Sequence, residues 1–320
     1  MMGVGVRTSL AMLLRPAVDA GMPRPSSAAL TGLRILVGLL WLYNLAWKLP
    51  PDFGKSSGSG VYGFTQDAVD NPVFPPYSWV VENLVLPNFT VFGWMVLVVE
   101  TALAVLLLTG TVVRLAALIG VGQALAIGLS VAETPGEWPW AYWMMIGIHL
   151  VLLLTASGGA PSVDSVRAAA TGRGPTTARN LLLVWTAVVG LTGLVALLLA
   201  VGEDPLASSG SRLGGPDLSV SLGSYNLVGA VVLLGVAVLM GLAAFIRQPA
   251  LAVAAALVAV LAALSLYVQI TRTDVWLGGS NTSAAVYLCA AVVNGFTARL
   301  LTVERSRAHQ LAPQGSTRAS

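Results

Sequence analysis

Six polar side chains lie inside or at the edge of apolar segments, where an ionisable group costs several kcal/mol and often marks a functional site. The candidates for a polar cluster within the membrane are Arg34, Asn44, Glu100, Gln123 and His149, and Lys48 is the candidate for an outer anionic site. A carboxylate and an imidazole can exchange protons, while an arginine or an amide can bind a carbonyl oxygen. These residue types therefore predict a proton-coupled or redox-coupled pocket. A structural alternative stays open, in which the same residues only fasten helices together.

The composition indicates that these residues lie in a membrane protein. The 320 residues are 56% hydrophobic and only 10% charged, with a mean hydropathy of +0.80. Soluble domains carry about 25% charged residues, so a chain this apolar is predicted to be an all-α, polytopic membrane protein whose main partner is the lipid bilayer.

Spanning segments need roughly 20 apolar residues to cross about 30 Å of hydrocarbon. Eight segments meet this requirement, which predicts eight transmembrane helices arranged as two four-helix bundles, with a parallel 4+4 repeat as one reading. The segments are Leu30–Leu49, Asn88–Gly110, Val112–Val131, Pro139–Ala156, Leu181–Val201, Gly223–Ile246, Pro249–Ile270 and Thr282–Leu301.

The connecting segments complete the predicted organisation. It comprises a cytoplasmic N-terminal segment (1–29), a first four-helix module (30–165) with an outer loop (50–87), a linker (166–180), a second module (181–301) and a disordered tail (302–320). The outer loop has no evident helix or strand pattern. Its aromatic residues fit either a packed cap or an interfacial belt, and both readings stay open.

Arginine distribution predicts the orientation. Most arginines fall on the side of the N-terminus, and most acidic residues fall on the other side. Because cytoplasmic loops carry the excess of Lys and Arg, both termini are expected in the cytoplasm of a cell-membrane protein. Nothing in the chain predicts a nucleic-acid partner.

Depths along the helices suggest how the polar residues pair. At ~1.5 Å per residue, Arg34 lies about 6 Å from the inner edge and Glu100 about 15 Å from it. An arginine side chain reaches most of that gap, so the sequence favours an Arg34–Glu100 pair. Asn44 is expected to bond across the bundle. Lys48 is expected to mark the boundary by extending its amine to the headgroups.

The second half shows no comparable cluster. Its interior polar residues are Tyr267, Gln269, Cys289 and Asn294, with no charge at the midplane. The single cysteine excludes an internal disulfide and a cysteine-cluster metal site, and the two histidines at positions 149 and 309 cannot both ligate a haem within the membrane. We therefore expect neither a metal nor a haem.

Several stretches of the first half resemble one family. They are RILVGLLWLYNLAWKLP (34–50), GFT (63–65), FGWMVLVVETALAVLLLTG (92–110), RLAALIG (114–120) and WPWAYWMMIGIHLVLLLTASGGAPSVDS (138–165), which ends with Asp164. These stretches resemble DoxX-like membrane proteins, with DoxD, the small subunit of thiosulfate:quinone oxidoreductase, as the nearest branch. The chain departs from the family pattern at Gly158–Gly159, where Gly-Arg is expected.

The resemblance implies a four-helix module that contacts quinone beside a second redox subunit, in a complex acting on thiosulfate or related sulfur compounds. No catalytic residue follows from it. Two other functions stay open on the residues alone: a transporter or carrier of lipids or small molecules, and a membrane scaffold or assembly protein without catalytic activity.

Overall fold

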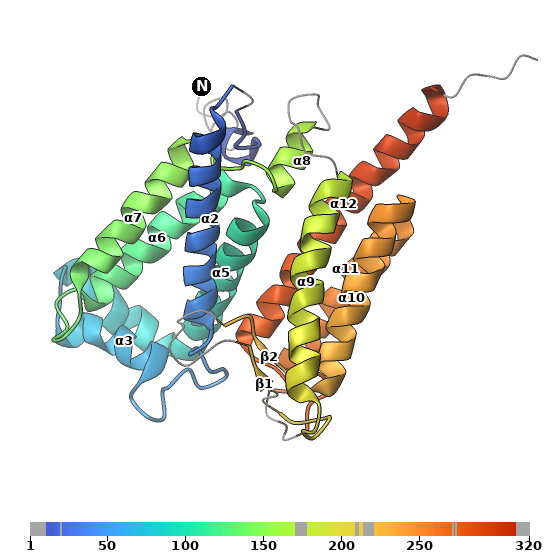
Figure 1. The fold of residues 1–320 in the computed structure, drawn as a ribbon. Helices are drawn as coiled ribbons and strands as arrows, with labels where there is room; N and C mark the ends of the chain where they lie inside the picture. Colours follow the sequence, from blue (N-terminus) through green and yellow to red (C-terminus); the bar gives the residue numbers. More distant parts are fainter. Residues whose placement is uncertain are drawn as a thin grey trace, which may run out of the picture.

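The computed structural model describes residues 11–19, 21–169, 178–208, 211–213, 221–270, 272 and 274–311. Long helices make up most of this part of the chain (Figure 1), as expected for apolar segments that must satisfy their own backbone hydrogen bonds. The long helices are α2 (Arg24–Leu45), α5 (Phe89–Thr109), α6 (Val113–Val131), α7 (Pro139–Leu154), α9 (Ala178–Ala200), α10 (Leu227–Ile246), α11 (Pro249–Val268) and α12 (Asn281–Leu311).

Shorter elements connect the long helices. On the side where α2 ends, the chain forms α3 (Gly60–Asp70), α4 (Pro75–Val80), the π-helix η1 (Val81–Val85) and the 3₁₀-helix η2 (Leu86–Asn88). Helix α8 (Val163–Ala169) lies between the two halves of the chain, and the two-residue strands β1 (Ser211–Arg212) and β2 (Ser224–Tyr225) pair antiparallel.

Seven helical segments in the described part of the chain are long and apolar enough to cross a membrane. One of them is continuous from Pro75 to Thr109, because α4, η1, η2 and α5 follow one another without a break. Helix α7 is apolar but has only 16 residues, or about 24 Å of helix. The chain is therefore a multi-pass membrane protein.

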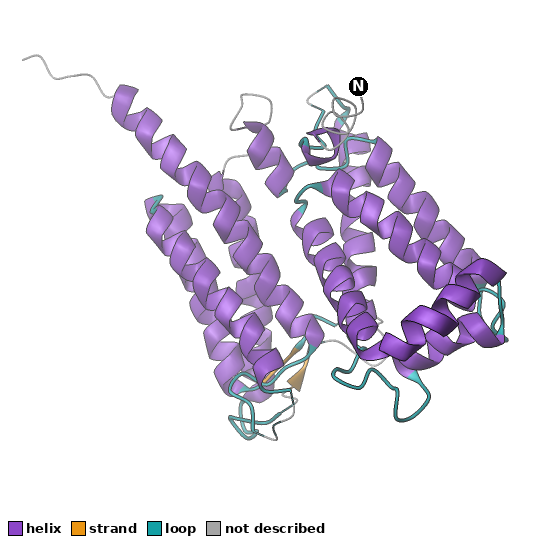
Figure 2. Cartoon of the chain, turned by 180° about the vertical axis from the view of Figure 1, so that it is seen from behind, coloured by secondary structure: helices purple, strands orange, loops and turns teal. Residues whose placement is uncertain are grey.

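Each half of the chain forms a ring of four packed helices (Figures 1 and 2). In the first half, neighbouring contacts join α2 to α5, α5 to α6, α6 to α7, and α7 back to α2. In the second half, contacts join α9 to α10, α10 to α11, α11 to α12, and α12 back to α9. Alanine dominates the closest approaches in the second ring, where Ala252, Ala255 and Ala259 of α11 are fully buried. Small side chains let membrane helices pack closely by van der Waals contact.

Helix α12 joins the two rings. It packs against α2 and α5 as well as against its own bundle. Ala285 and Cys289 on α12 belong to the hydrophobic core of the first half. The Asn281 side-chain amide, at the start of α12, donates hydrogen bonds to the backbone carbonyls of Leu45 (3.2 Å) and Lys48. The two halves are thus held together by both apolar packing and polar contacts.

The outer segment 50–87 is not the irregular loop that the sequence predicts. Most of it is helical, and two of its aromatic residues pack against α5: Phe53 is buried and meets Trp94 of α5 edge to face at 5.5 Å. Tyr62 of α3 contacts Phe89 in the same way at 4.9 Å. Apolar burial against α5 orders this segment, although prolines and glycines hide its helical pattern. The structure has features of both readings: Phe53 and Tyr62 pack against α5, whereas Phe64, Phe74 and Trp79 are exposed, as in an interfacial belt.

Three other boundaries differ from the prediction. The tail was expected to be disordered from residue 302, but α12 continues to Leu311, and residues 312–320 lie outside the described part. Helix α8 extends to Ala169, into the predicted linker, whose residues 170–177 also lie outside. Helix α2 begins at Arg24, six residues before the predicted start, because Pro23 and Pro25 suit a helix N-terminus.

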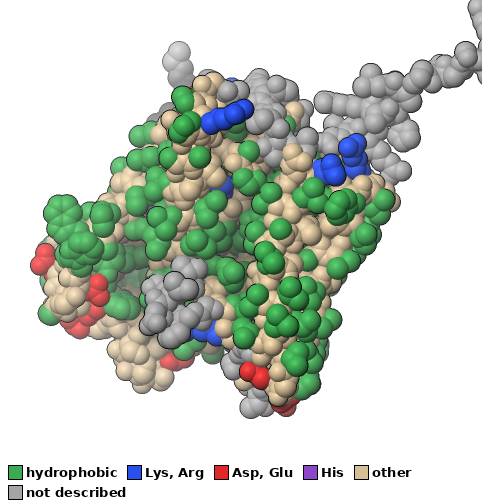
Figure 3. Space-filling view, in the orientation of Figure 1, with side chains coloured by type: hydrophobic (Ala, Val, Ile, Leu, Met, Phe, Trp, Pro, Cys, Tyr) green, Lys and Arg blue, Asp and Glu red, His purple; other side chains and the backbone are tan. Residues whose placement is uncertain are grey.

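Charged side chains separate toward opposite ends of the molecule. On the face drawn in Figure 3, acidic side chains gather at the end away from the N-terminus, and apolar side chains cover most of the region between the two ends. This covering is the surface that lipid tails require.

Candidate functional site

A cavity of about 260 Å³ lies inside the first half, toward the end where α3 and α4 cover the bundle. Residues of α2, α3, α4, α5, α6 and α7 and the segment after α2 line it. The lining residues are Asn44, Trp47, Lys48, Val61, Phe64, Thr65, Tyr77, Phe92, Met95, Val96, Val99, Glu100, Gln123, Ala126, Ile127, Ser130, Val131 and Tyr142. Most of the wall is apolar, with a few polar groups, as in many small-molecule sites.

A buried ion pair forms the centre of the polar wall. Lys48 Nζ lies 2.6 Å from Glu100 Oε2, and the two side chains are 2% and 1% exposed. Glu100 lies in the middle of α5, and Lys48 follows the end of α2, so the lysine folds back into the bundle. Burying either charge alone would cost several kcal/mol, and the short contact offsets much of that cost.

Three neighbouring groups also contact this ion pair. Gln123 Nε2 of α6 donates a hydrogen bond to Glu100 Oε1 (3.1 Å), so three chain segments meet at one carboxylate. Lys48 Nζ also donates to the Asn44 carbonyl (3.0 Å) and lies 3.7 Å from the centre of the Trp47 ring. A cation over an indole face gains further stabilisation from the ring quadrupole. The resulting Lys48–Glu100–Gln123 cluster presents an amine, a carboxylate and an amide to one cavity.

The apolar wall extends to the surface of the chain. Phe64 of α3 and Met95 of α5 line the cavity and are 41% and 54% exposed. The apolar wall of the cavity therefore reaches the surface beside Phe64 and Met95, on the part of the chain that lipid tails would cover. A molecule with a polar head and an apolar tail could place its head at the ion pair and its tail toward this surface.

Arg34 does not pair with Glu100 as the sequence suggested. Its guanidinium is fully buried at the other end of α5, where it donates hydrogen bonds to the backbone carbonyls of Leu107, Leu108 (3.2 Å) and Pro161 (3.4 Å). The last carbonyls of a helix have no partner within the helix and carry partial negative charge, so they attract a cation. Arg34 is a capping residue and does not line the cavity.

His149 is also separate from the cavity. Its Nε2 accepts a hydrogen bond from Trp41 Nε1 (3.0 Å), which leaves Nδ1 as the donor to the Met145 carbonyl (2.7 Å). Both ring nitrogens are thus satisfied by a neutral imidazole. Gly120 faces the ring so closely that a Cβ there would lie 2.1 Å from His149 Cδ2. His149 therefore fastens α7 to α2, which is the structural role that the sequence left open.

Two further expectations from the sequence are wrong. Lys48 does not extend its amine to the headgroups, because Glu100 draws it inward. The Asn44 amide does not bond across the bundle, since its Nδ2 donates to the Leu40 carbonyl of the same helix (3.3 Å). Asn44 still lines the cavity. The expected cluster therefore divides into a cap at Arg34, a Trp41–His149 contact, and a cavity-lining group of Asn44, Lys48, Glu100 and Gln123.

Sequence reasoning missed the polar residues that the cap adds to the cavity. Tyr77 Oη of α4 lies 2.9 Å from Ser130 Oγ and donates to the Ala126 carbonyl (3.1 Å). From α7, Tyr142 donates to the carboxylate of Glu137, in the segment just before that helix. Nearby, partial burial and the carboxylates of Asp70 and Glu137 raise the pKa of Asp67 above its usual value. Only the packing of α4 against α6 brings Tyr77 and Ser130 together.

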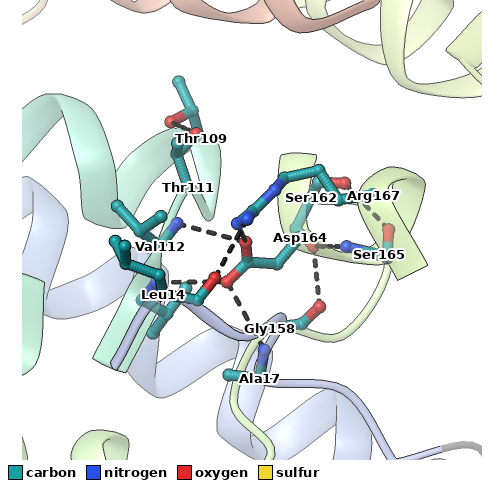
Figure 4. A network of polar contacts seen from close by, with 11 residues as sticks. Leu14, Ala17, Thr109, Thr111, Val112, Gly158, Ser162, Asp164, Ser165 and Arg167 are labelled. Atoms are coloured by element: carbon teal, nitrogen blue, oxygen red, sulfur yellow. Dashed lines mark hydrogen bonds and ion pairs between the residues drawn. The ribbon is translucent and has the colours of Figure 1, made fainter. Parts of the chain in front are cut away.

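A second polar network lies at the opposite end of the first bundle (Figure 4). The buried Asp164 carboxylate accepts hydrogen bonds from the backbone amides of Val112 and Val113, both at 3.1 Å, and lies 2.7 Å from the Arg167 guanidinium. It also accepts from the Ala17 amide at 3.5 Å. A carboxylate at the start of α6 satisfies free amides and complements the helix dipole. Asp164 therefore ties the N-terminal segment, α6 and α8 together.

Gly159 packs closely against α2. A Cβ at Gly159 would lie 2.7 Å from Ser27 Oγ and 2.8 Å from Thr31 Oγ1 of α2. A side chain as large as arginine at this position would displace α2, so glycine suits the local packing.

No group of three or more His, Cys, Asp or Glu side chains that could hold a metal ion occurs among the residues that the structure describes. Comparisons of the chain with family models, with curated proteins and with solved structures found no match.

Proposed function

We propose that the first bundle binds the head of a quinone in the cavity beside Lys48, Glu100 and Gln123, and that the chain is a DoxX-like or DoxD-like membrane subunit of a redox complex. One observation carries the proposal: a buried amine, carboxylate and amide meet in a cavity whose apolar wall reaches the surface.

These three side chains suit the chemistry of a quinone. Each quinone carbonyl accepts hydrogen bonds, and Lys48 and Gln123 supply donors. Reduction of a quinone to a quinol takes up two electrons and two protons, and the Glu100 carboxyl group is placed to exchange a proton with the ring oxygen. A second redox subunit supplies or accepts the electrons, with thiosulfate or a related sulfur compound as the substrate class that the resemblance implies.

The size of the cavity agrees with binding of a head group. Its volume of about 260 Å³ is slightly below the ~300–1,000 Å³ typical of sites that enclose whole drug-sized ligands. A long isoprenoid tail would therefore leave the cavity beside Phe64 and Met95 and lie in the membrane.

The membrane arrangement belongs to the same proposal. Helix α7 serves as an eighth span, which places the two rings of four helices in the membrane as a parallel repeat. The arginine excess puts both termini in the cytoplasm and the quinone cavity in the outer half of a cell membrane.

The test measures quinone binding by the purified protein in lipid nanodiscs, using short-chain benzoquinone and naphthoquinone probes. We expect Glu100→Gln to weaken binding about tenfold or more, because one charged hydrogen-bonding partner is worth about 1.5–3 kcal/mol. Glu133→Gln is the matched control, since Glu133 is an exposed acid on the same side. It should leave binding unchanged.

The double variant Lys48→Gln/Glu100→Gln separates binding from folding. Removing one member leaves an uncompensated buried charge, whereas removing both does not. We expect the double variant to be more stable than either single variant and still to bind quinone poorly. Absence of quinone binding by the unchanged protein would contradict the proposal. If, in that case, another small molecule co-purified, a carrier function would replace it; if nothing did and the variants lost only stability, a scaffold function would.

A further inference from the structure

A second cavity lies between the two halves of the chain. It has a volume of about 260 Å³ and is lined on one side by Ala46, Leu49 and Pro50, which follow α2. Its other side comes from the end of α11 and the segment leading into α12. Both α2 and α11 end here and α12 begins here, so the cavity lies at the end of the membrane spans. That is the depth at which lipid phosphates meet water.

Two side chains from the second half supply hydrogen-bond donors to this cavity. Gln269 is 2% exposed, and its Oε1 accepts a hydrogen bond from the Trp276 amide (3.0 Å). Its Nε2 has no hydrogen-bond partner among the described residues, although the side chain lines the cavity. Arg272 also lines the cavity, is exposed, and forms no ion pair with any described residue. An amide nitrogen and a guanidinium that have no partner among the described residues are both suited to an anion.

The start of α12 adds favourable electrostatics. Gly278, Gly279, Ser280 and Asn281 line the cavity, and α12 begins at Asn281 and runs for 31 residues. Gly278 and Gly279 have φ angles of +64° and +144°, which side-chain-bearing residues rarely adopt. The N-terminus of a long helix carries partial positive charge and free backbone amides, which together favour phosphate groups.

No carboxylate is found among the described residues that line this cavity. Asp274 precedes the lining residue Val275, but it is exposed and is not part of the lining. The remaining wall is apolar and includes Leu49, Leu266 and Ile270. The electrostatic character of the cavity is thus positive, with an apolar side next to it.

We propose that this cavity binds a phosphate group, presented either as the headgroup of an anionic membrane lipid or as a free phosphate ion. Arg272 and the Gln269 amide donate to the phosphate oxygens, and the start of α12 contributes its dipole. A bound phosphate contacts both halves, because Leu49 and Pro50 belong to the first and Arg272 to the second. This proposal is independent of quinone binding in the first bundle.

The experiment measures binding of phosphatidylglycerol, phosphatidylcholine and inorganic phosphate to the delipidated, full-length protein by native mass spectrometry and by thermal shift. We expect phosphatidylglycerol or inorganic phosphate to bind, and Arg272→Gln to weaken that binding about tenfold. A charged hydrogen bond of about 1.5–3 kcal/mol corresponds to a change of this size or larger. Arg212→Gln is the matched control, because Arg212 is an exposed arginine at the same end of the spans that does not line the cavity.

The outcomes distinguish the two sources of phosphate. Arg272-dependent binding of phosphatidylglycerol, without binding of inorganic phosphate, identifies a lipid site, and the converse identifies a free-anion site. Equal binding of phosphatidylglycerol and phosphatidylcholine, or equal effects of Arg272→Gln and Arg212→Gln, would overturn the proposal. Arg272 is exposed, so its substitution should leave the thermal stability of the delipidated protein unchanged.

Discussion

Three buried charged residues of this protein are each compensated by a different kind of partner. Glu100 has Lys48, Arg34 has the last carbonyls of α5, and Asp164 has the first amides of α6 together with Arg167. The first of these pairs lines the cavity of the first bundle, whereas Arg34 and Asp164 are not among its lining residues. The presence of a charged residue in an apolar segment therefore did not by itself identify the candidate site.

Arg34 provides the prediction at the residue scale. Arg34→Met keeps much of the side-chain volume but removes the donors to the carbonyls of Leu107, Leu108 and Pro161. The Leu107 carbonyl keeps the Gly110 amide as a donor (3.3 Å), but a buried carbonyl left without any donor costs about 1–3 kcal/mol. We expect the melting temperature in detergent to fall by several degrees, while the proposed binding of quinone in the cavity is unchanged.

Arg24→Met is the control for this experiment, since Arg24 is an exposed residue at the start of the same helix. An equal loss of melting temperature in both variants would show that Arg34 has no capping role.

At the scale of elements, the packing of three helices depends on a single glycine. Small residues on α6 let it approach α7, and Gly120 makes room for the ring of His149, which in turn holds Trp41 of α2. The Trp41–His149 hydrogen bond thus depends on a glycine in a third helix.

A pair of glycine substitutions tests this dependence. Gly120→Ala places a Cβ within 2.1 Å of His149, so we expect a lower melting temperature and a quench or shift of tryptophan fluorescence as Trp41 moves. Gly122→Ala is the matched control in the same helix, because its Cβ would meet nothing within 4 Å. It should leave stability unchanged or raise it slightly, since alanine favours helix by about 1 kcal/mol over glycine. Similar melting temperatures for the two variants would contradict the packing argument.

At the scale of the whole molecule, α12 decides how the two rings are held together. Cys289 is 1% exposed and packs in the core of the first half although it belongs to the second. As the only cysteine, it is a natural reporter of separation between the halves.

Thiol labelling measures this separation. We expect Cys289 to react with a maleimide at least tenfold more slowly in the native protein than after unfolding in denaturant. Asn281→Ala removes the hydrogen bonds to Leu45 and Lys48 and should accelerate native labelling several-fold. Asn83→Ala, at an exposed position in the cap, is the control. Rapid native labelling of the unchanged protein would contradict a stable interface between the halves.

Much of the fold could be predicted from the sequence, because hydropathy reports directly on the solvent that each segment faces. The long apolar segments all became helices, and the charge separation between the two ends was already visible along the chain. The helical cap between Pro50 and Pro87 was missed, since its helices are short and contain proline and glycine, and only contacts such as Phe53 with Trp94 order them.

The sequence by itself determined that this is a multi-pass helical membrane protein whose first half holds the polar candidates. Only the tertiary structure decided which of them share a cavity. Depth along a helix predicts the height of a side chain in the membrane, but not the direction in which it points around the helix or how a flexible chain bends. For that reason Lys48, expected at the surface, reaches the buried Glu100, whereas Arg34 bonds to backbone carbonyls that carry no signal in the sequence.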